Sequence, residues 1–70
     1  MSPDHADALH LKGLVAFQTG VSDEAEASIR RAVELRPGEV EFRANLAAVL
    51  LRQDRIDEAE QTCSDVLRVD

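Results

Sequence analysis

Apolar residues recur along the chain at the three- and four-residue spacing of amphipathic helices, in four stretches separated by short polar breaks. The pattern predicts helices over about residues 3–19, 23–36, 40–53 and 56–70, the first beginning at Pro3 if Ser2 is its N-cap and slightly later if Asp4 is. No stretch shows the two-residue alternation of a strand. The residues expected to face inward are Leu9, Gly13, Ala16 and Phe17 in the first stretch, Ala25, Ile29, Ala32, Val33 and Leu35 in the second, Phe42, Leu46, Val49 and Leu50 in the third, and Ala59, Cys63, Val66 and Leu67 in the fourth.

The breaks between the four stretches carry start and stop signals for helices. Gly20 suits a left-handed C-cap, Ser22 suits an N-cap, and Pro37-Gly38 ends the second stretch. Asp54-Arg55 forms the turn between the third and fourth stretches. Connections this short predict that consecutive helices are antiparallel neighbours.

The sequence also contains an internal repeat, two similar copies of one unit. The run Asp23-Glu24-Ala25-Glu26 returns 34 positions later as Asp57-Glu58-Ala59-Glu60, and Val15 and Val49 have the same separation. A fixed period of this length is typical of stacked helical hairpins. The prediction is therefore an all-α domain over residues 1–70 with two stacked antiparallel hairpins, repeat one over 6–39 and repeat two over 40–70, the second ending before its closing proline.

Composition and charge narrow the possible partners. The chain has 44% hydrophobic and 31% charged residues, as in a helix-rich globular piece, and a formal net charge of −6. A net acidic chain lacks the basic stripe that nucleic acid requires, and no apolar run has the length of a membrane span. One cysteine and an N-terminus without signal-peptide features indicate a cytoplasmic protein.

None of the chemistry-bearing residues forms a catalytic or metal-binding pattern. His5 and His10 are expected to be solvated, because their spacing puts them on different sides of a helix. Cys63 lies on an apolar stripe and is expected in the core rather than as a nucleophile. The two acidic runs each occupy the first turn of a helix, where negative charge is favoured. No cofactor, metal or enzymatic activity is expected.

Several positions of the repeat carry a family resemblance. Gly13 and Ala25 are small residues where two helices would cross, Ile29 is a large apolar residue, Ala32 is small again, and Pro37 closes the unit. This order resembles a tetratricopeptide repeat, and residues 40–70 resemble a second one. Small side chains let helices approach closely, while larger ones fill the space between layers.

The resemblance implies a protein-interaction module. In this family the first helices of successive repeats line a concave groove that holds an extended peptide or a partner helix. Asn45 stands where related arrays use an amide to grip the main chain of a ligand, since an amide can donate and accept hydrogen bonds at once. Carried over position by position, the implied contacts are His10, Leu14, Phe17, Gln18, Glu41, Asn45, Ala48 and Arg52.

Two other functions are also compatible with the sequence. The opening residues loosely resemble repeat segments fused to glycosyl- or sulfotransferase domains, so the chain is alternatively the N-terminal substrate-presenting arm of a larger transferase. The third alternative is a self-associating helical spacer, because each hairpin leaves an apolar face that it cannot bury alone. A homodimer would then form through Ile56, Cys63, Val66 and Val69.

Overall fold

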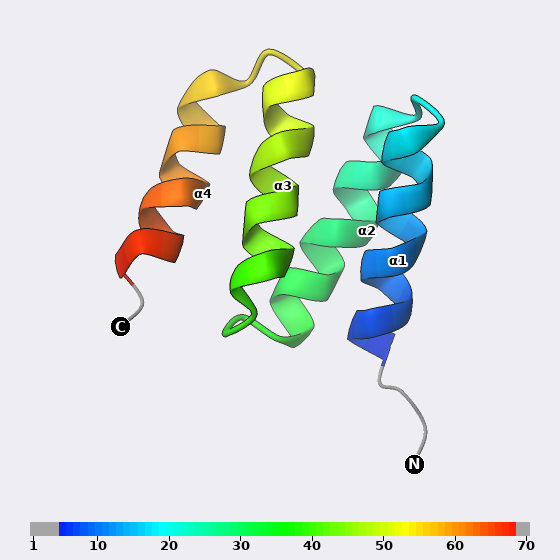
Figure 1. The fold of residues 1–70 in the computed structure, drawn as a ribbon, viewed down its shortest axis with the longest axis horizontal. Coiled ribbons are helices and arrows are strands. Elements are labelled where there is room, and N and C mark those ends of the chain that lie inside the picture. The colour runs from blue at the N-terminus through cyan, green and yellow to red at the C-terminus, as the bar shows by residue number, and fades with distance from the viewer. Residues whose placement is uncertain (1–4, 69–70) are drawn as a thin grey trace.

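The computed structural model describes the backbone of residues 5–68 and the side chains of residues 5–64. Within this range the chain forms four helices and no strand (Figure 1). They are α1 (His5–Gln18), α2 (Ser22–Leu35), α3 (Val40–Arg52) and α4 (Ile56–Arg68). The predicted all-α architecture is confirmed, and the starts of α3 and α4 agree with the sequence pattern.

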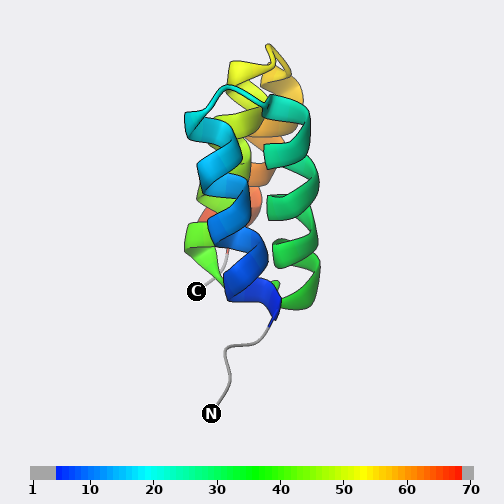
Figure 2. The same ribbon diagram turned by 90° about the vertical axis from the view of Figure 1, so that its right-hand side faces the viewer.

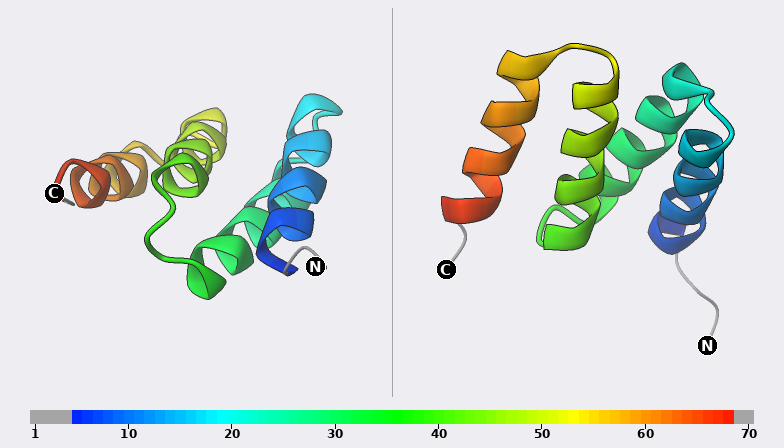
Figure 3. Two further views of the ribbon diagram at one scale, coloured as in Figure 1. Left: turned by 60° about the horizontal axis from the view of Figure 1, so that its bottom comes forward. Right: turned by 45° about the horizontal axis from the view of Figure 1, so that its top comes forward.

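The helices form two antiparallel hairpins that stack through α2 and α3. In Figure 1, α1 and α3 run upward and α2 and α4 return downward. Figure 2 looks at the first hairpin, where α1 and α2 lie side by side in front of the second. The left panel of Figure 3 shows the chain crossing from α2 to α3 between the two hairpins. The first helices of both hairpins therefore point the same way.

The turns inside the two hairpins are copies of each other. Gly20 has φ +86° and Asp54, 34 positions later, has φ +66°, so both occupy the left-handed region. The N–H of Val21 donates to the carbonyl of Ala16 (2.9 Å), and the N–H of Arg55 donates to that of Leu50 (2.9 Å). Each turn thus ends its helix with a Schellman-type C-cap, which satisfies carbonyls of the last helical turn.

One apolar cluster spans both hairpins. Its fully buried members include Ile29 on α2 and Val49 and Leu50 on α3, and burying each of these side chains is worth about 1.5–3 kcal/mol. Leu14, Phe17 and Val33 pack against its edge. A smaller cluster joins Ala6, Ala32 and Phe42 near the lower end. The buried members of the main cluster are Ala16, Ala25, Ile29, Leu46, Ala47, Val49, Leu50 and Ala59.

Three expectations from the sequence are wrong in detail. Ser22 is the first residue of α2 rather than its cap, and the capping residue, Val21, makes no side-chain hydrogen bond. Leu35 is 47% exposed, because it is the last residue of α2 and lines a surface hollow with His5, Leu9 and Arg31. Cys63 is exposed, because no described element packs over its side of α4. The side chains of Val66 and Leu67 and the whole of Val69 lie outside the described residues.

Candidate binding surface

The predicted contact residues come from α1 and α3, and the surface that they are expected to form is called here the α1–α3 face. Two pairs of side chains link the helices across it, and each pair joins the first hairpin to the second. Its members are His10, Leu14, Phe17 and Gln18 from α1, and Glu41, Asn45, Ala48 and Arg52 from α3.

The first pair is His10 and Asn45. The amide Nδ2 of Asn45 lies 2.8 Å from the Nε2 of His10, and the His10 ring packs on Phe42 with centroids 4.3 Å apart. When the amide nitrogen donates, Nε2 accepts, so the imidazole is neutral with its proton on Nδ1. His10 is only 8% exposed, so the expectation of a solvated histidine is wrong. It lies beneath Asn45, and only His5 of the two histidines is exposed.

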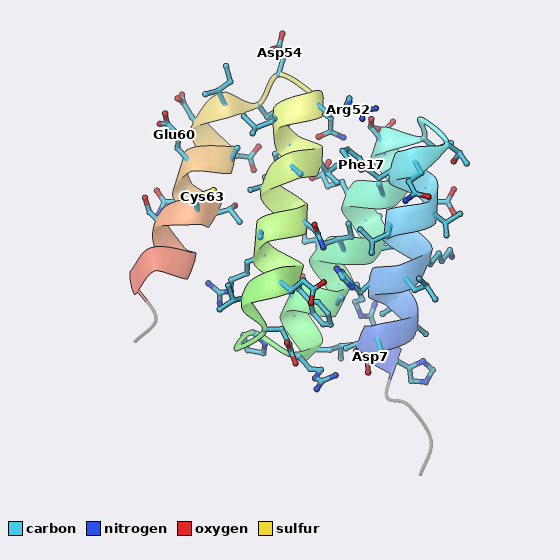
Figure 4. All side chains as sticks on the ribbon, in the orientation of Figure 1. Asp7, Phe17, Arg52, Asp54, Glu60 and Cys63 are labelled. Carbon is cyan, nitrogen blue, oxygen red and sulfur yellow. The ribbon has the colours of Figure 1, made fainter. Side chains whose placement is uncertain are left out.

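The second pair is Phe17 and Arg52. The guanidinium carbon of Arg52 lies 4.4 Å from the centroid of the Phe17 ring, in cation–π geometry. Phe17 is half-buried against the main cluster, whereas Arg52 is exposed. Figure 4 shows both side chains at the upper end of the stack, next to the hairpin turns. The pair places a fixed positive charge at that end of the face.

The other members of the face differ in exposure. Leu14 and Ala48 are half-buried, Leu14 against the main apolar cluster, and Gln18 and Glu41 are exposed. Glu41 lies in the first turn of α3, at the opposite end of the face from Arg52. The face therefore changes from acidic to basic along its length, with the Asn45 amide between the two ends.

A second polar cluster ties the hairpins together behind this face. Glu26 on α2 accepts hydrogen bonds from Arg30 (2.8 Å) and from Arg55 of the second turn (2.6 Å). Burial raises the pKa of Glu26, but its hydrogen bonds to Arg30, Arg55 and Gln53 outweigh this effect and hold the pKa below its ordinary value. The four-residue spacing of Glu26 and Arg30 on α2 favours the first contact, whereas the contact with Arg55 joins two different hairpins.

A hollow lies on α3 and α4, at the side of the stack opposite α1. Its lining is Leu51, Ala59, Glu60, Cys63 and Ser64. Figure 4 shows Glu60 and Cys63 on α4, at the side of the molecule farthest from α1. Leu51 is 53% exposed here. Ile56, also named for self-association, is 52% exposed but lines a different hollow, around the second turn.

Metal ligands and membrane spans are not found in the described part of the chain. Within residues 5–64, no group of three or more His, Cys, Asp or Glu side chains is placed to hold a metal ion. None of the four described helices has both the length and the apolarity that crossing a membrane requires.

The chain is similar in sequence to a known protein family. The family model described as tetratricopeptide repeat matches residues 16–70, from the end of α1 through α4. The chain belongs to the tetratricopeptide repeat family. The resemblance noted in the sequence is thereby confirmed. Repeats of this family generally mediate protein–protein interaction and are typically non-catalytic scaffold modules. The chain matched none of the curated proteins and none of the solved structures with which it was compared.

Proposed function

We propose that this tetratricopeptide repeat chain is a protein-interaction module that binds an extended peptide, or a partner helix, across the α1–α3 face without a catalytic role. In this proposal residues 6–39 and 40–70 are its two repeats. The observation that carries it is the hydrogen bond between His10 and Asn45, which orients a polar amide between the acidic end of the face at Glu41 and its basic end at Arg52.

Asn45 is suited to hold a main chain because His10 uses only part of its hydrogen-bonding capacity. Among the described residues, the Asn45 side chain bonds to His10 through one N–H. A second N–H and the acceptor oxygen of the amide then serve a ligand. An amide fixed in this way loses less side-chain entropy on binding than a mobile one. In this proposal His10 positions Asn45 and does not touch the peptide.

The opposite charges at the two ends of the face favour one orientation of a bound peptide. Glu41 and Arg52 are 11 positions apart on one helix, which is about 16 Å at 1.5 Å per residue. An extended peptide covers that distance with about five residues. The preferred ligand then carries a basic group near Glu41, small or apolar side chains over Leu14 and Ala48, and an acidic group near Arg52.

Peptide display tests this function directly. The 70-residue chain is used as bait for a library of random heptapeptides, and the affinity of each enriched peptide is measured by calorimetry. Asn45→Ala is expected to weaken the selected peptides about tenfold, since a hydrogen bond to a fixed partner is lost. Gln61→Ala, which removes an exposed amide on α4, is the matched control and leaves affinity unchanged. Equal affinity for wild type and Asn45→Ala would remove the assignment.

A further inference from the structure

His10 and Asn45 each direct one polar atom at the other and leave one polar atom open to solvent. The Nδ2 of Asn45 lies 2.8 Å from the Nε2 of His10. Neither the Oδ1 of Asn45 nor the Nδ1 of His10 bonds to a described group. Among the described residues, no buried side-chain nitrogen or oxygen lacks a hydrogen-bond partner, so both of these atoms reach solvent. One end of the Asn45 amide therefore contacts His10, and the other end is available to a ligand.

The protonation state of His10 decides which end of the amide faces the ring. A neutral imidazole with its proton on Nδ1 has a lone pair on Nε2, which accepts from the Asn45 N–H. A protonated imidazole carries a hydrogen on both nitrogens, so two donors would then face each other. Rotating the amide by half a turn restores the hydrogen bond, because Oδ1 accepts from the Nε2–H. The ring itself is 8% exposed and packs on Phe42, so the amide is the group that rotates.

The two orientations of the amide offer different groups to a ligand. When His10 is neutral, Asn45 presents Oδ1 and one N–H to solvent, which match the N–H and the carbonyl of a peptide main chain. When His10 is protonated, Oδ1 faces the ring and Asn45 presents its NH2 group to solvent. A main-chain N–H of the ligand then meets a donor where it had met an acceptor.

We propose that His10 sets the hydrogen-bonding specificity of the α1–α3 face through Asn45. Neutral His10 favours a peptide whose main chain presents an N–H to Asn45, and protonated His10 disfavours the same peptide. This inference rests on the proposed function and adds that His10 is a positioning residue whose charge controls binding. Histidine ordinarily changes its charge between about pH 5 and pH 8, so the peptide is expected to bind more tightly at pH 8 than at pH 5.

Charged groups near this pair come from three helices. On α1, Asp7 stands one turn before His10 and pairs with Arg36, at the end of α2, at 3.2 Å. On α3, Glu41 stands one turn before Asn45. In the described part of the chain, α4 does not contact α1. Carboxylate and guanidinium groups ordinarily keep their charge where an imidazole gains its proton, so a histidine variant separates the effect of His10 from theirs.

Nuclear magnetic resonance of the intact chain tests the rotation of the amide without a ligand. Asn45 is the only asparagine of the 70 residues, so its side-chain NH2 signals are assigned directly. The nitrogen chemical shifts of the His10 ring report its protonation. The Asn45 NH2 signals are expected to move between pH 8 and pH 5 with the midpoint of the His10 ring. Asn45 signals that stay constant while His10 gains its proton would overturn the proposal, as would a His10 ring that stays neutral at pH 5.

A peptide with esters in place of amides tests which ligand atom responds. The probe is a histidine-free heptapeptide from the display experiment, together with variants in which each main-chain amide in turn becomes an ester and so loses its N–H. Wild-type chain is expected to bind the parent peptide about tenfold more weakly at pH 5 than at pH 8. One ester position should weaken binding at pH 8 and also abolish the pH dependence, because the N–H that meets Asn45 is absent.

His10→Gln and His5→Gln form a matched pair of variants. Glutamine offers an acceptor oxygen to the Asn45 N–H but carries no titrating group, so His10→Gln should bind the peptide equally at pH 8 and pH 5. His5→Gln, at an exposed histidine of the same helix, should keep the wild-type loss. Circular dichroism at both pH values confirms that each variant is folded. A loss of affinity at pH 5 that His10→Gln shares would assign the pH dependence to another group and overturn the proposal.

These measurements also separate this inference from the proposed function. If Asn45→Ala weakens the peptide but wild-type affinity is equal at pH 8 and pH 5, the proposed function stands and the role of His10 is wrong. If Asn45→Ala leaves the affinity unchanged, the assignment of Asn45 to the ligand is wrong, and the role of His10 in specificity is wrong with it.

Discussion

Gly13 of α1 lies so close to Ile29 of α2 that a Cβ at position 13 would stand 2.4 Å from Ile29 Cγ1. The same added Cβ would lie 3.2 Å from the carbonyl oxygen of Ala25. Both distances are below those of ordinary van der Waals contact, so the two helices cross at a separation that only glycine permits. In the second hairpin the corresponding residues are Ala47 and Cys63, where a larger residue on the first helix accompanies a smaller one on the second.

Gly13→Ala should therefore destabilise the chain. The crowded methyl group is expected to cost 1–3 kcal/mol, against which the better helix propensity of alanine returns up to about 1 kcal/mol. The net loss, about 1–2 kcal/mol, is measured by urea unfolding. Gly38→Ala is the control, because a Cβ at Gly38 meets no atom within 4 Å. Adding Ile29→Cys copies the second hairpin, and the double mutant should lose less than the sum of the single losses. Strict additivity would contradict the packing argument.

Acid should weaken the contact between the hairpins through Glu26. Its pKa is lower in the folded chain than in the unfolded chain, so the unfolded state binds the proton more readily. The contribution to stability is fully present above the ordinary pKa of about 4.5 and is lost as the pH falls through the folded pKa. The free energy of unfolding measured between pH 7 and pH 3 should fall below about pH 4.5.

Glu26→Gln tests whether that loss belongs to this residue. At pH 7 the variant is expected to be about 1 kcal/mol less stable, the upper end for an ion pair near the surface, and its acid-induced loss should be smaller than in wild type. Glu34→Gln, at an exposed glutamate of the same helix, should keep the wild-type loss. An acid profile identical in wild type and Glu26→Gln would show that other carboxylates cause it.

The left-handed turn at Asp54 should tolerate glycine better than alanine. A residue with a Cβ at φ +66° is strained by about 1 kcal/mol or more, and aspartate tolerates this region better than alanine does. Asp54→Gly copies Gly20 of the first turn and should be about 1 kcal/mol more stable than Asp54→Ala in thermal unfolding. Gln61→Gly against Gln61→Ala is the matched comparison in the middle of α4, where the order reverses. Equal stability of the two Asp54 variants would mean that the turn rearranges.

The buried His10 and the half-buried Asn45 should behave as a coupled unit. His10→Phe keeps an aromatic ring against Phe42 but removes the hydrogen-bond acceptor, so it should cost about 1–2 kcal/mol by leaving the Asn45 amide without its partner. Asn45→Leu in the same background should recover part of that loss. The coupling energy from the double-mutant cycle is expected to be at least 0.5 kcal/mol. A value near zero would mean that the hydrogen bond does not hold the two hairpins together.

Helical spacing, the start and stop signals and the 34-residue period were together sufficient to predict the helices, the turns and most of the core. Helical spacing placed Ile29, Leu46 and Val49 inside, and the equivalence of Gly20 and Asp54 followed from the repeat. These features depend on residues close in sequence, or on positions that the period makes equivalent. Cys63 was misplaced for a related reason, because the period shows that it corresponds to the buried Ile29 but not whether a further helix covers it.

The contacts between hairpins could not be predicted from the pattern. His10 and Asn45 are 35 positions apart, and Glu26 and Arg55 are 29 apart, so both pairs depend on how one hairpin is rotated on the other. The spacing of residues along a single sequence does not give the angle by which one hairpin is rotated on the other.

The apolar cluster that Ile29 and Leu50 share sets how the chain opens. Neither hairpin has a core of its own, since Val49 and Leu50 of the second are buried together with Ala25 and Ile29 of the first. Separating the two hairpins would expose the buried apolar side chains of both to water. Amide protons in the middle of α2 and α3 are therefore expected to exchange with solvent at one common, slowest rate, whereas α4, held on a single side, frays ahead of them.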